Sequence, residues 1–182
     1  MQRLREGDDL ALNELMTRWK EPLATFALRY TGNVTDAREI AQETFIKVYG
    51  ARHSYRPTAA FSTWLFGIAV NLCKMRARWR SRHPEVLASD RDDSAAAAIA
   101  GAESGADPAG ETDRRALADD IDRAIRILPH QLRVAFVLFE VQGQSYRQVA
   151  QVLNCSEKAV ERRLAKARER LKSQLEFKWK EA

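Results

Sequence analysis

Basic side chains gather in two short segments of this chain, where they could neutralise phosphates and contact bases. The formal net charge is +5, from 30 lysines and arginines against 25 acidic residues. The first segment holds Lys74, Arg76, Arg78, Arg80 and Arg82, and the second holds Lys158, Arg162, Arg163, Lys166, Arg168, Arg170 and Lys172. Arginine can read guanine through paired donors, whereas lysine neutralises phosphates. Gathered rather than dispersed charge indicates a partner with a nucleic-acid backbone.

The second basic segment lies in a pattern that predicts a helix-turn-helix. Ser145 can cap a short helix ending near Leu153, and Asn154 tolerates the positive φ angle of a tight turn. Ser156 can then cap the last helix. In that helix Val160, Leu164, Ala167 and Leu171 are spaced to face the core, which leaves Arg162, Arg163, Lys166 and Arg170 outward. A basic second helix of this kind can enter the major groove of DNA.

Two further helices are expected before this motif. The first carries Ile121, Ala124, Ile125 and Leu128 and ends at Pro129, and the second carries Val134, Phe136, Val137, Leu138 and Val141 and stops at Gly143.

The N-terminal part also predicts helices, because its apolar residues recur at helical spacing. A first stripe, interrupted near Pro22 and stopped by Gly32, holds Leu12, Leu15, Met16, Trp19, Leu23, Phe26 and Tyr30. Thr35 is expected to cap the next helix, whose apolar side is Ile40, Phe45 and Val48. A long helix from about Ala60 to Arg82 has a predicted core seam of Phe61, Leu65, Ile68, Leu72, Met75 and Trp79.

Aromatic residues lie beside the first basic segment. Tyr55, Phe61 and Trp64 could stack on unpaired bases while basic residues hold the backbone. Asn71 and Lys74 project from a different face of the long helix than the seam. The alternative is an ordinary solvated basic face, with Phe61 in the core.

An acidic segment separates the two parts. Residues 84–115 are rich in Ala, Ser, Gly and Asp and contain almost no large apolar residues, so we expect a flexible linker. The predicted fold is therefore all-α, with helical domains at 1–83 and 116–182 joined by this linker.

Other functions find little support in the sequence. Cys73 and Cys155 are isolated and expected to be reduced and buried, and the histidines are scattered, so no metal site or cofactor is predicted. No phosphate-binding loop or catalytic motif occurs, which argues against an enzyme. The charged N-terminus and the lack of a long apolar run predict a cytoplasmic protein without membrane insertion.

Beyond these patterns, three stretches resemble sigma factors of bacterial RNA polymerase. Leu128–Leu171 resembles region four, Thr31–Tyr49 resembles regions 2.1 to 2.2, and Ala60–Arg82 resembles the minus-ten recognition regions. The order and spacing of these stretches are similar to those in the extracytoplasmic-function (ECF) group of sigma factors. Met75, Ala159 and Asn154 depart from residues common in that group.

The resemblance implies functions for particular residues. It implies upstream-element contacts by Ser156, Lys158, Arg162, Arg163 and Lys166, and minus-ten contacts by Tyr55, Phe61, Trp64, Asn71, Lys74 and Arg78. It also implies that Asp36, Glu39, Gln42 and Glu43 dock on the clamp helices of the largest polymerase subunit. Implied partners are core RNA polymerase, including the flap of its second-largest subunit, promoter DNA and an anti-sigma factor.

Two other classes of function remain open at this point. A stand-alone helix-turn-helix regulator would bind duplex DNA as a dimer and would not need the Thr31–Tyr49 match. A nuclease would need clustered carboxylates, whereas the acidic residues here are concentrated in the predicted linker.

Overall fold

The computed structural model describes residues 1–83 and 108–181, with side chains described for 1–83 and 116–176. Within these ranges every regular element is helical, which confirms the predicted all-α fold. None of the helices in this part of the chain combines the length and apolar character that crossing a membrane requires. Most of the expected linker, residues 84–107, lies outside the described residues.

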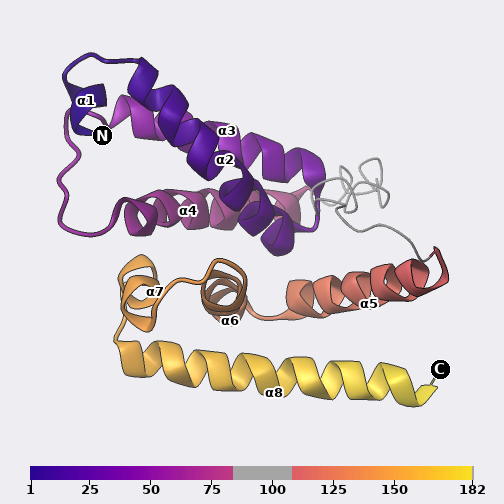
Figure 1. Ribbon diagram of the computed structural model, residues 1–182. Helices are drawn as coiled ribbons and strands as arrows, with labels where there is room; N and C mark the ends of the chain where they lie inside the picture. The colour runs from indigo at the N-terminus through magenta and orange to yellow at the C-terminus, as the bar shows by residue number, and fades with distance from the viewer. Residues whose placement is uncertain (84–107, 182) are drawn as a thin grey trace.

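The helices form two groups that we call the N-terminal half (1–83) and the C-terminal half (108–181). The first contains α1 (Gln2–Arg5), α2 (Leu10–Thr31), α3 (Val34–Gly50) and α4 (Phe61–Arg82). The second contains α5 (Pro108–Ile127), α6 (His130–Phe136), the π-helical turn η3 (Val137–Val141), α7 (Tyr146–Val152) and α8 (Glu157–Glu181). Figure 1 shows α2, α3 and α4 together above α5, α6 and α7, with α8 outermost. Helix α5 therefore includes residues 108–115, which the sequence analysis assigned to the linker.

Two expectations for this region are not met, one within α2 and one at the start of α3. Helix α2 runs without a break through Pro22, so the expected interruption is wrong. Gly32 does end it, with a left-handed φ of 70° that glycine adopts without strain. The N-cap of α3 is Asn33 rather than Thr35, because the Asn33 side chain accepts a 2.8 Å hydrogen bond from the Asp36 backbone N–H.

Helix α4 has the predicted bounds but turns a different face to the core. Leu65 and Leu72 are buried as expected, whereas Met75 and Trp79 are 61% and 38% exposed, so the second half of the predicted seam is wrong. The buried face instead includes Ser62, Phe66, Ala69 and Cys73. Ser62, Ala69 and Cys73 are small, so the spacing of large apolar residues alone does not indicate this face.

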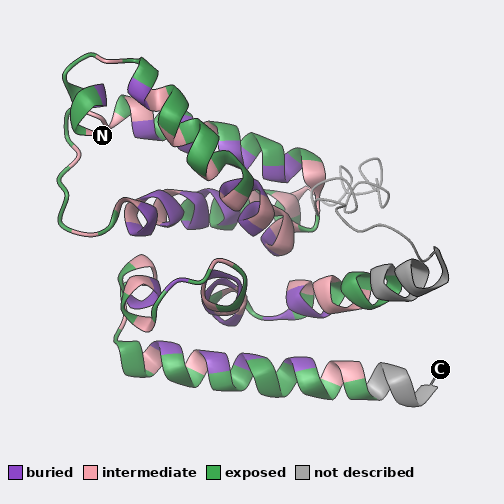
Figure 2. Ribbon diagram, in the orientation of Figure 1, coloured by how far each residue is buried: buried purple, intermediate pink, exposed green. Residues whose placement is uncertain are grey.

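The core continues from one half of the molecule into the other. Buried residues of α2, α3 and α4 form a single connected cluster with those of α5, α6, η3, α7 and α8. Helix α4 packs on α7, and α2 packs on α5 and η3. In Figure 2 buried segments of α4 face the C-terminal half while the lower side of α8 is largely exposed.

Candidate nucleic-acid interfaces

The helix-turn-helix forms where the sequence predicts it. The Ser145 hydroxyl accepts a hydrogen bond from Gln148 N–H, and the Gln148 side chain accepts one from Ser145 N–H at 2.8 Å, a reciprocal capping box. Asn154 occupies the turn with φ 48°, as expected. The Ser156 hydroxyl accepts a 3.2 Å bond from Ala159 N–H at the start of α8. Local side-chain hydrogen bonds therefore define where α7 and α8 begin.

The inner faces of the two helices pack as the periodicity requires. Val149, Val160, Leu164 and Ala167 are fully buried, with Ala150 and Leu171 nearly so. Burying this face leaves the opposite side of α8 for solvent and for a ligand.

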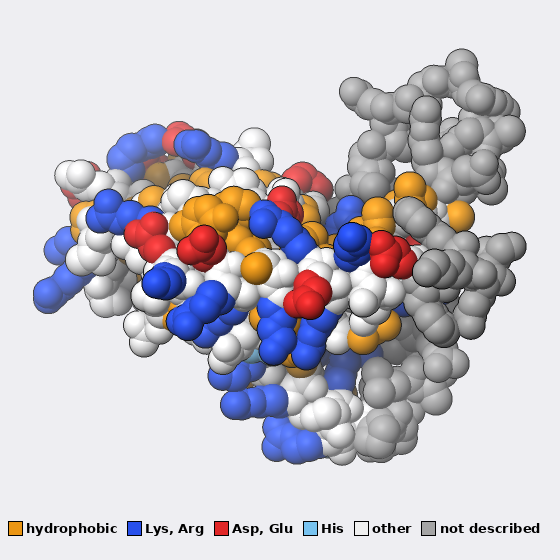
Figure 3. Space-filling model, turned by 90° about the horizontal axis from the view of Figure 1, so that it is seen from below, with side chains coloured by type: hydrophobic (Ala, Val, Ile, Leu, Met, Phe, Trp, Pro, Cys, Tyr) orange, Lys and Arg blue, Asp and Glu red, His pale blue; other side chains and the backbone are white. Residues whose placement is uncertain are grey.

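The outward face of α8 carries the predicted basic residues. Ser156, Lys158, Arg162 and Lys166 are exposed. Figure 3 views the molecule from the side on which α8 lies, and lysine and arginine side chains are spread across that face. The face can neutralise phosphates and present donors to base edges.

Arg163 lies differently from Arg162. It is half-buried, and its Nη1 lies 3.1 Å from the Cys155 sulfur. Cys155 is itself only half-buried, which corrects the prediction that both cysteines are buried; Cys73 is fully buried. Arg163 is thus held against the turn, and Arg162 is the more accessible of the two.

The predicted base-stacking aromatics lie together at the start of α4. The ring centroids of Tyr55 and Trp64 are 4.7 Å apart, and Phe61 lies 5.9 Å from Trp64. Trp19 of α2 joins the group edge-on to Phe61 at 6.1 Å, a member that the sequence analysis placed only in the core. All are partly exposed, so the group combines core packing with an accessible aromatic surface.

Polar members of the predicted minus-ten set occupy another side of α4. Asn71, Lys74 and Arg78 are all exposed. At 100° per residue they share one side of the helix, away from the face packed on α3. An ammonium, a guanidinium and an amide are thereby available along about two helical turns.

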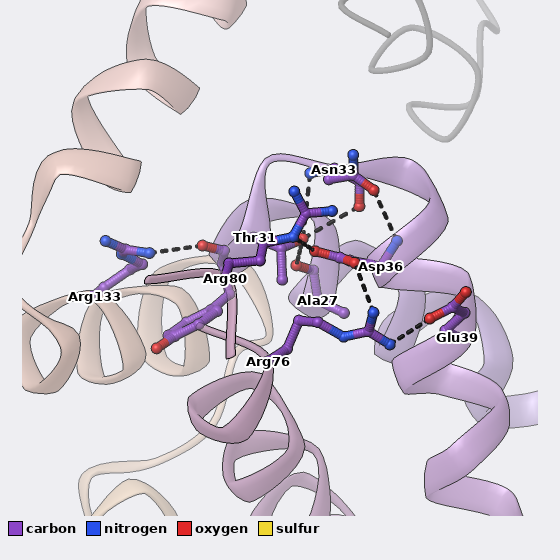
Figure 4. A network of polar contacts seen from close by, with 9 residues as sticks. Ala27, Thr31, Asn33, Asp36, Glu39, Arg76, Arg80 and Arg133 are labelled. Atoms are coloured by element: carbon purple, nitrogen blue, oxygen red, sulfur yellow. Dashed lines mark hydrogen bonds and ion pairs between the residues drawn. The ribbon is translucent and has the colours of Figure 1, made fainter. Parts of the chain in front are cut away.

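Asp36 is buried, which corrects the expectation that it lies on an exposed docking stripe. Its carboxylate pairs with Arg76 at 3.3 Å and with Arg80 at 2.5 Å, and only 1% of the residue is accessible. Figure 4 shows both arginines reaching from α4 toward Asp36 at the start of α3. A buried carboxylate needs such partners, so Asp36 joins α3 to α4. No local pattern in the sequence indicates this function of Arg76 and Arg80.

The other three docking candidates are accessible on α3. Glu39 is paired with Arg76 but has half of its side chain exposed. Glu43 lies 3.5 Å from Lys47, one turn along the helix, and Gln42 is exposed. We call Glu39, Gln42 and Glu43 the α3 stripe.

The chain matches two domain families in the order that the resemblance implies. Residues 15–83 match the family Sigma-70 region 2, and residues 118–171 match Sigma-70, region 4. Within the described ranges, no group of three or more His, Cys, Asp and Glu side chains could hold a metal ion.

Whole-chain relatives agree with these matches. The chain is 32% identical to the RNA polymerase sigma-H factor of Pseudomonas aeruginosa, over 100% of this chain and 95% of that protein. It is 33% identical to the ECF RNA polymerase sigma-E factor of Escherichia coli K12, over 97% and 92%.

Solved structures show the same fold. A complex of the sigma factor RpoE with the anti-sigma factor NepR from Bartonella quintana gives a TM-score of 0.66 at 24% identity, covering 90% of this chain and 96% of that one. CnrH in complex with the cytosolic domain of CnrY gives 0.66 at 23% identity, covering 96% and 94%.

This chain belongs to the sigma-70 family, in its ECF group. It is a sigma factor, which directs RNA polymerase to specific promoters for transcription initiation. The match over residues 15–83 decides against a stand-alone helix-turn-helix regulator, because such a regulator has no need of region 2.

Proposed function

We propose that the two halves divide promoter recognition between α8 and α4. Helix α8 reads the minus-thirty-five element in the major groove through Lys158, Arg162, Arg163 and Lys166, with Ser156 at its start. Helix α4 and the aromatic group hold the unpaired minus-ten strand. The observation that carries this proposal is that each half exposes its own basic surface, and that the partly exposed rings of Tyr55, Phe61 and Trp64 gather at the start of α4.

The α8 surface and the α4 surface differ in chemistry, and each suits a different form of DNA. Duplex DNA offers base edges in a groove, which suits the exposed arginines and lysines of a single helix. An unpaired strand offers base faces, which suits the rings of Tyr55, Phe61 and Trp64 next to a phosphate-binding surface of Lys74 and Arg78. Asn71 carries both a donor and an acceptor and can read the edge of an extruded base.

Core polymerase docks on the α3 stripe in this proposal. Exposed carboxylates on a helix suit a basic helical partner such as the clamp helices of the largest subunit. Region 4 contacts the flap of the second-largest subunit. An anti-sigma factor is a further proposed partner, as in the RpoE–NepR complex. The chain performs no chemical step itself, acts in the cytoplasm, and is divided into domains at 1–83 and 116–182 around the linker 84–115.

Transcription from a promoter library tests this division. Purified chain and core polymerase are given linear templates with both promoter elements randomised, and transcribed templates are sequenced. We expect two enriched motifs, with the upstream one changed by Arg162→Ala and the downstream one changed by Asn71→Ala. If Arg162→Ala altered the downstream motif, or Asn71→Ala the upstream one, the assignment of elements to helices would be wrong.

A further inference from the structure

The C-terminal end of α2 is tied to the other half of the molecule by Tyr30, His130 and Arg133. The Tyr30 hydroxyl lies 2.6 Å from His130 Nδ1, and Tyr30 is 2% exposed. Arg133 Nη1 donates a 2.8 Å hydrogen bond to the Tyr30 carbonyl, and its guanidinium lies 4.9 Å from the centre of the Tyr30 ring. Figure 4 shows Arg133 reaching toward this end of α2.

The same guanidinium also holds the end of α5. Arg133 Nη2 donates to the Leu128 carbonyl at 3.0 Å and to the Arg126 carbonyl. One cation therefore binds the carbonyl ends of two helices, one from each half, where the helix dipoles are negative.

An ion pair and a close backbone approach lie alongside. Arg29 of α2 pairs with Asp122 of α5, and both side chains are largely buried. The Arg126 side chain lies so close to Gly32 that a Cβ there would overlap it. We call Arg29, Tyr30, Asp122, His130 and Arg133 the latch.

The packing of the two halves also covers part of the side of α4 that carries the proposed DNA contacts. Thr63 and Val70 are each 5% exposed, although they lie on the same side of α4 as Lys74 and Arg78. Helix α7 of the C-terminal half packs on α4, beneath its first turns in Figure 1. An incoming strand would have to share this side of α4 with the other half.

The packed form cannot read both promoter elements at once, because the two elements lie too far apart on DNA. The elements are named for positions about 25 base pairs apart, which is about 85 Å along B-DNA. Helices α4 and α8 both pack on α7, and packed helices lie about 8 to 10 Å apart, so they approach within about 20 Å.

We infer that the packed arrangement is an inactive form of the free chain, held closed by the latch, and that its halves separate when the promoter is engaged. This inference rests on the proposed function. The α3 stripe stays exposed in the closed form, so polymerase can dock before the halves part. Interfaces between parts of one chain can open, and separating the halves here has to break both the latch and the apolar packing that the halves share.

Charge swapping at Arg29 and Asp122 tests the latch without touching a proposed DNA or polymerase contact. Asp122→Arg places a third arginine beside Arg29 and Arg126 and should open the chain. Small-angle X-ray scattering should show a radius of gyration clearly above the roughly 16 Å of a compact chain of this length. The double variant Arg29→Asp with Asp122→Arg should return it to the wild-type value.

Promoter binding without polymerase supplies the functional measurement. On DNA that carries both elements and a mismatched minus-ten region, Asp122→Arg should bind about tenfold more tightly if the closed form outnumbers the open one tenfold. On a duplex with only the upstream element, it should bind like the wild type. If Asp122→Arg lost helical circular dichroism, the milder Arg29→Gln would replace it.

Two results would overturn the inference: an unchanged radius in the opened variants, or a larger radius with no gain in binding to the two-element DNA. Transcription by the wild-type chain with core polymerase is measured in parallel. Its absence would count against the proposed function, whereas normal transcription with either of those results would count against the latch alone.

Discussion

The hydroxyl of Tyr30 in α2 lies 2.6 Å from Nδ1 of His130 in α6, and the two rings meet edge to face with centroids 5.6 Å apart. Burial raises the pKa of Tyr30 to about 12, so the hydroxyl keeps its proton and can donate it. Burial lowers the pKa of His130, and Lys74 and Arg78 of α4 with Arg133 of α6 lower it further. The closed form therefore favours a neutral His130 that accepts the bond.

Mild acid should open the chain through His130. Well above pH about 6.5 the imidazole is neutral in both forms, so pH has no effect there. As pH falls below that value the open form takes up a proton that the closed form resists, and closure weakens until the lowered pKa is reached. The radius of gyration should rise between pH 7.5 and 5.5, and His130→Gln should remove that rise. An identical profile for His130→Gln would exclude this histidine as the cause.

Asp36 should matter for stability far more than its exposed neighbour Glu39. Replacing Asp36 with alanine leaves Arg76 and Arg80 without their buried partner and should cost about 3 to 5 kcal/mol of unfolding free energy. Glu39→Ala should cost about 0 to 1 kcal/mol, because that side chain is half exposed. Urea unfolding of the two variants checks this, and equal losses would mean that the buried network is not what stabilises α3 on α4.

The α3 stripe should determine docking rather than folding. The double variant Glu39→Gln with Glu43→Gln should weaken binding to core polymerase by about tenfold at low salt, since two carboxylates no longer attract a basic surface. Melting temperature should stay near that of the wild type. Glu21→Gln, an exposed carboxylate on α2, serves as the matched control in a titration against labelled core enzyme. Equal affinity of the stripe variant and this control would remove the stripe from the interface.

Arg162 and Lys166 should affect upstream binding in different ways. Arg162→Ala should cost about 1 to 3 kcal/mol on the preferred duplex and relax the choice at one base pair, if the arginine reads a guanine. Lys166→Ala should weaken all sequences alike and reduce the salt slope of log affinity by about 1. Fluorescence anisotropy on matched and mismatched duplexes separates the two. Loss of discrimination with Lys166→Ala alone would reverse these assignments.

The helix-turn-helix could be predicted because its determinants are local. The Ser145 cap, the positive φ of Asn154 and the buried positions from Val160 to Leu171 each depend on residues a few positions away. Asp36 could not be assigned in this way, because its partners Arg76 and Arg80 lie on another helix about forty residues later.

The other wrong or missing predictions also concern contacts between residues far apart in the sequence. Met75 and Trp79 continue a regular apolar spacing, yet the arginines on the neighbouring face turn inward to Asp36 and leave them exposed. The contact between Tyr30 and His130 joins residues 100 positions apart, and no periodicity within either helix indicates it. The resemblance to sigma factors supplied the function of each half but not the way the halves meet.

Promoter opening is the activity that we propose for α4, and Asn71 is the residue there with the most specific predicted contact. Asn71 is exposed, so Asn71→Ala should leave the melting temperature unchanged. With core polymerase it should form closed complexes on a linear promoter but fail to open them. A template already mismatched across the minus-ten region should restore activity, because the cost of unpairing has been removed.

Potassium permanganate footprinting of unpaired thymines measures this most directly. With core polymerase and the wild-type chain together, thymines across the minus-ten element should become reactive, and neither component alone should expose them. Asn71→Ala should abolish the signal on duplex DNA, whereas transcription should recover on the mismatched template, whose thymines are unpaired without any protein. Protected thymines with the wild-type chain and core polymerase on a promoter selected from the library would contradict the account.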